Sequence, residues 1–146
     1  MKFAGDPEVW LPRFPEAWVP EPPGWFMTRA LVPTHPPTLP DGYALEVEAT
    51  AHRTTVRITG PSGELAARGQ LGLGAEYAVP DRIVTEPGHQ RLGLGSLVMA
   101  ELGNQALKVC RTRAVLGATV DGRALYERLG WRVVAPMSGA YCRRSG

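Results

Sequence analysis

Proline is concentrated in the first part of this 146-residue chain, where ten of the 14 prolines precede Asp41. Because proline fixes φ and lacks a backbone N–H, residues 1–40 exclude a long helix and favour extended chain, with one short strand at 25–32. Three of the four tryptophans lie in the same stretch, and side chains this large and apolar are rarely left in water. We therefore expect residues 1–40 to form an arm that packs on a body of residues 41–146, either within one chain or in a homodimer. A flexible leader is the alternative that a proline-rich composition leaves open.

Composition excludes several classes of protein. The formal net charge is +2 and the basic residues are scattered, so the sequence offers no basic stripe for nucleic acid. No apolar run approaches the ~20 residues that a membrane span needs, and Asp6, Pro7 and Glu8 stand where a signal peptide would be apolar. Two cysteines are too few for a disulfide framework or a four-ligand zinc site. We expect a cytoplasmic protein with no metal, no membrane and no nucleic-acid partner.

Apolar and polar side chains alternate from residue 43 onward, as they do in half-buried strands. The pattern predicts strands at 43–49 and 56–59, a turn at 60–63, a returning strand at 64–71 and a further strand at 76–85. Pro80 interrupts the last of these, which indicates an edge, a bulge or a splayed site. The longest helix opens at Gly93 or Leu94, and its buried face is predicted to hold Leu94, Leu97, Val98, Leu102, Ala106 and Val109.

The rest of the chain alternates short strands with one helix. Residues 114–120 are predicted as a buried strand, and Asp121 is placed to cap a helix over 122–129 that Gly130 ends. Short strands follow at 131–135 and 140–143. This order predicts a mixed α/β sheet with parallel pairing around the long helix.

The segment 87–96, which joins a strand to the long helix, carries the chemistry. It reads Pro-Gly-His-Gln-Arg-Leu-Gly-Leu-Gly-Ser. Its glycines allow backbone to approach a ligand, and the start of a helix presents unpaired N–H groups and a positive dipole end. Arg91 adds charge and Ser96 a hydroxyl, so the segment is suited to phosphate or pyrophosphate.

Two common phosphate motifs do not fit this segment. A Walker A loop needs a lysine after Gly95, and the dinucleotide fingerprint needs glycine where Val98 stands. Gly72-Leu73-Gly74 fails the same fingerprint at Tyr77. Judged on glycines alone, Gly93 and Gly95 fit tight packing between strand and helix as well as they fit ligand binding.

Two motifs together resemble a known family. Gln90-x-x-Gly93-x-Gly95 is similar to the pyrophosphate loop of the GCN5-related N-acetyltransferases (the GNAT superfamily), and residues 83–87 resemble the strand and proline that lead into it. Residues 122–131 are similar to the second signature of that family, in which Tyr126 and Gly130 hold the tyrosine and glycine positions. The two motifs follow the family's order and spacing, and the resemblance covers roughly half the chain.

The resemblance implies a mixed central sheet, a splayed strand before a pyrophosphate loop and a long helix, with the proline- and tryptophan-rich arm in place of the usual first helices. It implies acetyl-CoA as the acyl donor, with its pyrophosphate on loop amides and its pantetheine along the strand before the loop. The residues implied to bind it are Ile83, Val84, Thr85, Gln90, Arg91, Leu92, Gly93, Leu94, Gly95 and Ser96.

The resemblance also implies direct transfer of acetyl to a small-molecule or peptide amine. Tyr126 would protonate the departing thiolate, and a carboxylate would deprotonate the amine. Asp81 is the favoured base, ahead of Glu76, while His89 is read as a loop-surface histidine and Cys110 as inert helix core.

Some positions depart from the family pattern. Thr119 stands where the family often has asparagine, and Leu92 replaces a frequent basic residue of the loop. The first strand and two helices that usually build the acceptor pocket are not recognisable. The leading hypothesis is therefore an N-acetyltransferase. The alternatives are a catalytically inactive acyl-CoA-binding regulatory or assembly protein, and a structural partner that docks through its arm.

Overall fold

A computed structural model describes residues 1–143, and the last three residues of the predicted body, 144–146, lie outside the described residues. The chain divides into two compact units. One unit runs from Ala30 to Val115, and the other combines Met1–Arg29 with the residues from Leu116 onward. The structure is a mixed α/β fold in which strands outnumber helices.

The unit of residues 30–115 is built on an antiparallel meander of four strands. These are β4 (Ala44–Ala49), β5 (Arg53–Thr59), β6 (Leu65–Leu73) and β7 (Ala78–Thr85). Strand β8 (Arg113–Ala118) begins in this unit and runs parallel to β7, with Ala114 opposite Ala78. The predicted strands and the parallel pairing around the long helix are confirmed, and only their ends move by a few residues.

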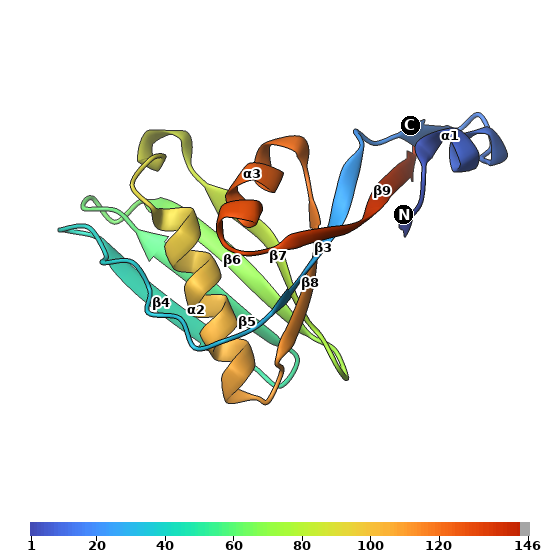
Figure 1. Cartoon of the computed structure of the whole chain (residues 1–146). Coiled ribbons are helices and arrows are strands. Elements are labelled where there is room, and N and C mark those ends of the chain that lie inside the picture. Colours follow the sequence, from blue (N-terminus) through green and yellow to red (C-terminus); the bar gives the residue numbers. More distant parts are fainter. Residues whose placement is uncertain (144–146) are drawn as a thin grey trace. The chain divides into compact units, whose positions relative to one another are not determined.

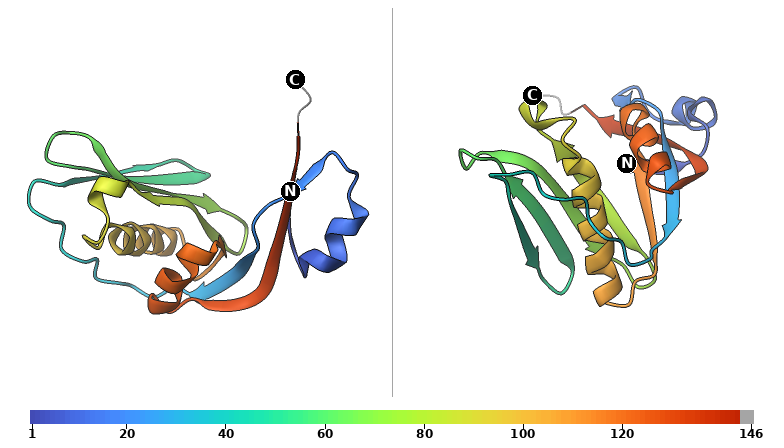
Figure 2. Two further views of the ribbon diagram at one scale, coloured as in Figure 1. Left: turned by 90° about the horizontal axis from the view of Figure 1, so that it is seen from above. Right: turned by 60° about the vertical axis from the view of Figure 1, so that its left-hand side comes forward.

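Helix α2 (Leu94–Lys108) covers one face of β5, β6 and β7 (Figures 1 and 2). The predicted apolar face is buried except at its end, where Val109 follows the helix and is exposed. Gly69 of β6 lies beneath the helix, since a Cβ built there would come 2.5 Å from Cγ1 of Val98 and 3.0 Å from Cδ1 of Leu102. The absence of a side chain at Gly69 therefore lets the helix approach the sheet.

Strand β7 bulges shortly before it ends. One residue of β6, Gly69, faces two residues of β7, Arg82 and Ile83, and the register shifts between Arg68 and Gln70. Arg82 has a φ of 54°, in the left-handed region that a non-glycine residue seldom enters. The disturbance predicted from Pro80 is thus present as a bulge two residues further along the chain.

An extended segment, residues 31–40, leads into β4. The N–H of Leu31 donates to the carbonyl of Thr112 at 2.8 Å. The side-chain amide of Asn104 on α2 accepts from the N–H of Thr34 at 3.0 Å and donates to its carbonyl at 2.7 Å. One asparagine thus satisfies both backbone groups of Thr34, as a neighbouring strand would.

The other unit is organised around β9 (Arg132–Cys142). Strand β3 (Gly24–Ala30) and β2 (Trp18–Pro20) pair with it antiparallel, and β1 (Lys2–Ala4) pairs with its residues 137–139. Helix α1 (Pro7–Trp10) and the 3-10 turn η1 (Leu11–Arg13) follow β1, and α3 (Val120–Arg128) precedes β9. Four aromatic rings form a row in the order Trp10, Phe3, Phe14 and Trp18, with neighbouring ring centroids 5.2–5.6 Å apart.

Two local predictions are wrong in this unit, and one short element was not predicted. The cap of α3 is Thr119, whose hydroxyl accepts from the N–H of Gly122, and Asp121 lies inside the helix. The two strands predicted at 131–135 and 140–143 are one strand, because Pro136 pairs with Trp25 and its carbonyl accepts from the N–H of Gly5. The short helix α1 was not foreseen; Asp6 caps it and Pro7 starts it, which is the proline position that a helix tolerates.

Within residues 1–143, none of the helices is long and apolar enough to cross a membrane.

Gly69→Ala is expected to lower the free energy of unfolding by about 1–3 kcal/mol, because the new methyl group would push against Val98 and Ile83 in a filled interior. Gly72→Ala in the same strand is the matched control. The nearest atom to its new Cβ is 3.8 Å away, so the change should be neutral or slightly stabilising. Urea unfolding of both variants measures the difference, and equal stabilities would contradict the close approach of α2.

Candidate functional site

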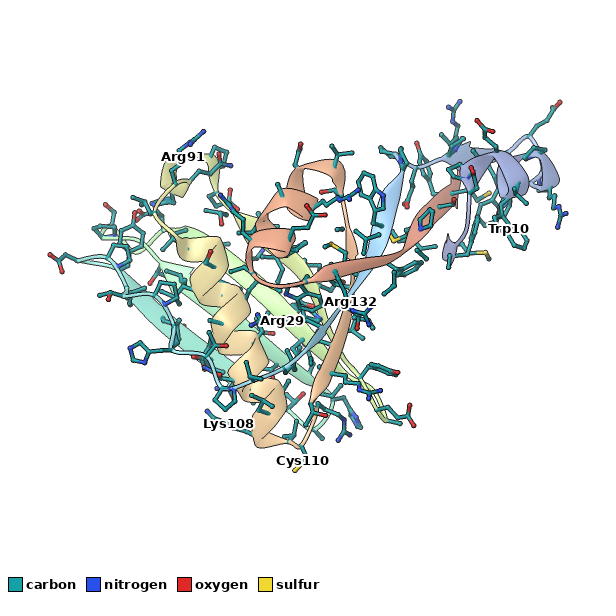
Figure 3. The ribbon with its side chains drawn as sticks, viewed as in Figure 1. Trp10, Arg29, Arg91, Lys108, Cys110 and Arg132 are labelled. Atoms are coloured by element: carbon teal, nitrogen blue, oxygen red, sulfur yellow. The ribbon has the colours of Figure 1, made fainter. Side chains whose placement is uncertain are left out.

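The predicted anion loop lies between β7 and α2. Its path includes a short 3-10 turn, η2 (Pro87–His89), and then an exposed stretch from Gln90 to Gly93. Arg91 projects from this end of α2, while Lys108 and Cys110 lie at the opposite end (Figure 3). The sequence therefore placed the loop and its charged residue correctly at the start of the helix.

The loop takes two left-handed backbone conformations within three residues. Arg91 has a φ of 62° and Gly93, the N-cap of α2, has a φ of 76°. Alternation of left-handed and ordinary residues turns successive N–H groups toward one side, a concave arrangement that binds anions. A Cβ at Gly93 would meet nothing within 4 Å, so this glycine serves backbone conformation and not packing.

The first turn of α2 is electrostatically open. No side chain caps it, and it contains no acidic residue. The unpaired N–H groups therefore lie at the positive dipole end of a 15-residue helix, and no acidic residue of the first turn neutralises that charge. A phosphate at this position would meet N–H groups that no described side chain occupies.

The predicted donor residues divide by exposure. Gln90, Arg91, Leu92 and Gly93 are exposed, and Gly95 and Ser96 are half-buried. Leu94 is buried, so only its backbone is available to a ligand. Along β7, Val84 pairs with Arg68, Thr85 pairs with Ala67, and the side chain of Ile83 faces Gly69.

Strand β7 has unequal neighbours. On one side it forms the antiparallel ladder with β6 as far as Thr85. On the other side it runs parallel to β8, with Ala78, its first residue, opposite Ala114. In an antiparallel ladder alternate residues direct their N–H and C=O groups away from the partner strand, so β7 presents such groups on the side away from β6.

The two carboxylates considered as bases, Asp81 and Glu76, are both exposed. Oδ2 of Asp81 lies 3.8 Å from Nε of Arg82, and both side chains are about 70% exposed. An ion pair in this setting is screened by water and contributes little to stability. Asp81 is thus accessible to an incoming amine without first breaking a buried interaction.

Tyr126 lies on α3 in the other unit. Its half-buried ring is 6.3 Å from the ring of Trp131, and Gly122 one turn earlier leaves room for it. Beside it, Arg123 contacts Glu127 at 2.8 Å and lies 4.6 Å from the Trp25 ring. Gly130 ends the helix with a φ of 86°, as the sequence predicted.

The structure corrects the interpretation of His89. Its side chain is only 15% exposed, and both ring nitrogens have neighbours. Nδ1 lies 2.8 Å from the hydroxyl of Tyr43, and Nε2 lies 3.3 Å from Oε1 of Glu64. His89 is thus neither a surface histidine nor a free base. Sequence reasoning missed Tyr43 and Glu64 because they are 46 and 25 residues away along the chain, and no local pattern links them.

The cysteines are also placed differently from the prediction. Cys110 is exposed just beyond the end of α2, with a φ of 60°, and is not helix core; Cys142 is also an exposed free thiol. Within residues 1–143, the structure brings together no group of three His, Cys, Asp or Glu side chains in the manner of a metal site.

Comparison with known proteins supports the motifs. The profile of the family described as "Acetyltransferase (GNAT) domain" matches residues 54–133, which is more than half of the chain and includes both the loop and Tyr126. No curated protein sequence matches the chain.

Solved structures share the fold. A GCN5-related N-acetyltransferase from Kribbella flavida aligns with 88% of this chain and 61% of its own, at 20% identity and a TM-score of 0.67. One from Sphaerobacter thermophilus aligns with 88% of this chain and 54% of its own, at 13% identity and 0.67. A putative GNAT acetyltransferase from Novosphingobium aromaticivorans aligns with 88% and 74%, at 15% identity and 0.64. The chain thus spans little more than half the length of the first two.

Gly93→Ala is expected to cost about 1–2 kcal/mol of stability, because alanine must adopt a left-handed φ in open space. Gly88→Ala in the same loop is the matched control, since its φ is ordinary and its Cβ also meets nothing within 4 Å. Because neither new methyl group meets a neighbour, thermal unfolding of the two variants isolates the cost of the left-handed backbone at Gly93. A Gly93→Ala variant as stable as the control would show that the left-handed conformation is not required.

Proposed function

The chain belongs to the GNAT acetyltransferase family, and on this basis we propose that it transfers the acetyl group of acetyl-CoA directly to an amine. The family match over residues 54–133 carries the proposal, since it contains both the donor loop and the tyrosine of the second motif. The identity of the donor as acetyl-CoA and the identity of the acceptor as an amine are both parts of the proposal.

The donor's pyrophosphate is proposed to bind at the exposed start of α2. The uncapped N–H groups of the first turn and the left-handed residues Arg91 and Gly93 support this assignment. The guanidinium of Arg91 adds a full positive charge. Leu92 is 45% exposed and carries no charge, so binding depends on Arg91 and on backbone donors.

The pantetheine arm is proposed to lie along β7 from Ile83 to Thr85. Its amides need a backbone partner, and the N–H and C=O groups of β7 that point away from β6 have strand geometry. A backbone N–H of the same strand would hold the thioester carbonyl as negative charge develops on its oxygen.

The transfer step breaks one bond and forms one. The amine nitrogen attacks the thioester carbonyl carbon, the C–S bond breaks, and the sulfur leaves as a thiolate. Asp81 takes the proton released from nitrogen, directly or through water, and the Tyr126 hydroxyl gives a proton to the thiolate. A tyrosine hydroxyl normally titrates near 10 and a thiol near 8.5, so this second transfer depends on orientation.

The acceptor is proposed to be a small-molecule or peptide amine. Strands β4 and β5 are joined by residues 50–52 alone, and the segment before β4 is extended. The predicted homodimer is a separate matter, and light scattering measures it. No helix of residues 30–52 is available to build an acceptor pocket.

The same observation favours the second candidate, an acyl-CoA-binding protein without turnover. Such a protein would keep the donor loop and lose the acceptor side. Its donor affinity would equal that of an enzyme, so only a rate separates the two.

Calorimetric titration with acetyl-CoA is expected to give a micromolar dissociation constant that depends on the pyrophosphate. Acetyl-pantetheine, which lacks it, should bind at least tenfold more weakly because it forfeits charge-assisted hydrogen bonds. Absence of binding at millimolar acetyl-CoA would overturn the proposal.

Tyr126→Phe is expected to lower kcat by about a hundredfold or more, with the acetyl-CoA dissociation constant within about twofold of wild type. Tyr141→Phe, at an exposed tyrosine of the same unit, is the control and should leave both unchanged. Thiol release over a panel of amines measures kcat. If the wild type binds the donor yet releases no thiol with any amine, the binding protein is the better description.

A further inference from the structure

Tyr43, His89 and Glu64 form a chain of side chains, here called the brace, at the η2 turn of the anion loop, directly before its exposed stretch 90–93. We propose that the brace holds this loop in its binding conformation and thereby sets the affinity for the pyrophosphate of the donor. His89 is a positioning residue in this proposal, which rests on the proposed function.

The loop needs outside support. Arg91 occupies a left-handed conformation that costs free energy, and such residues persist where surrounding structure over-determines them. The stretch 90–93 is exposed, so it has little packing of its own. Support therefore comes from the structure on either side of it: α2, which begins at Leu94, and the residues just before it.

Backbone hydrogen bonds fix only the beginning of the loop. The N–H of Glu86 donates to the carbonyl of Ala66 at 2.9 Å, which extends the β6–β7 ladder. The N–H of His89 donates to the carbonyl of Glu86, also at 2.9 Å, and closes the η2 turn. The side chain of His89 then ties that turn to two other places in the unit.

We assign the brace one polarity. A carboxylate oxygen of Glu64 lies 3.3 Å from Nε2, and because a carboxylate accepts, the ring proton is assigned to that nitrogen. Nδ1 is then an acceptor, and the Tyr43 hydroxyl donates to it at 2.8 Å. The Tyr43 ring also packs edge-on against the imidazole at 5.6 Å. His89 is thus held by contacts at both nitrogens and along its ring.

Gly60 belongs to the same arrangement. A Cβ at this buried glycine would overlap the Glu64 carboxylate and come 3.0 Å from Cε1 of His89. The turn between β5 and β6 therefore leaves this space to the carboxylate beside the imidazole. Gly60→Ala would displace the Glu64 carboxylate and press on the His89 ring, while both of these residues of the brace stay in the sequence.

His89→Ala is expected to raise the dissociation constant of acetyl-CoA about tenfold, while that of acetyl-pantetheine stays unchanged, because only the former uses the loop. His89→Asn, whose amide oxygen can replace Nδ1 as acceptor for Tyr43, should recover part of the loss. Tyr43→Phe should weaken binding in the wild type and add little in the His89→Ala background. Gly60→Ala should give a smaller loss of the same kind.

His35→Ala is the matched control, since His35 is an exposed histidine of the same unit and should bind both ligands as the wild type does. Hydrogen exchange of the amides of Glu86, His89 and Leu97, whose N–H groups are hydrogen-bonded at the two ends of the loop, provides a readout that needs no ligand. Exchange should be at least tenfold faster in His89→Ala than in wild type and unchanged in His35→Ala.

Two outcomes would overturn the proposal. In the first, His89→Ala has the exchange rates and the acetyl-CoA dissociation constant of the wild type. In the second, His89→Ala weakens the binding of acetyl-CoA and of acetyl-pantetheine equally, which would indicate general damage. If the wild type itself binds no acetyl-CoA, the proposed function fails separately. The exchange measurement then decides whether the brace orders the loop.

Discussion

The close approach of α2 to β6 is the constraint on which the donor side of this protein depends. Gly69 removes the side chain that would hold the helix off the sheet, and six residues of α2 become buried as a result. With the helix seated, the chain has only residues 86–93 in which to leave β7 and reach the first turn of α2. The conformation of that short connection is therefore tightly limited by the packing on either side of it.

A tightly limited connection can hold backbone groups in positions that a free loop would not keep. A left-handed arginine and an uncapped helix end are each unfavourable in isolation, and together with the left-handed Gly93 they orient N–H groups for an anion. The bulge at Arg82 is a further irregularity a few residues upstream. The buried packing of α2 against the sheet thus supports the irregular, exposed loop that connects β7 to α2.

Local signals in the sequence predicted the elements that local physics determines. The period of apolar residues predicted α2 and the strands between residues 44 and 118, and glycine positions predicted the C-terminal end of α3 and the start of α2. Errors arose where distant residues decide the outcome. Pro136 continues a strand because Trp25 and Gly5 pair with it, and His89 is engaged because Tyr43 and Glu64 are brought to it by the fold.

The same distinction explains why the donor is easier to assign than the acceptor. A site made of backbone N–H groups constrains few side chains, chiefly the glycine at a left-handed position, so a short local motif is enough to predict it. An acceptor site selects its substrate through side-chain shape and charge, which depend on residues that are distant along the chain. The extended segment before β4 and the three-residue connection after it carry no local pattern that identifies an acceptor. Identification of the amine therefore has to come from chemistry tested on this protein itself.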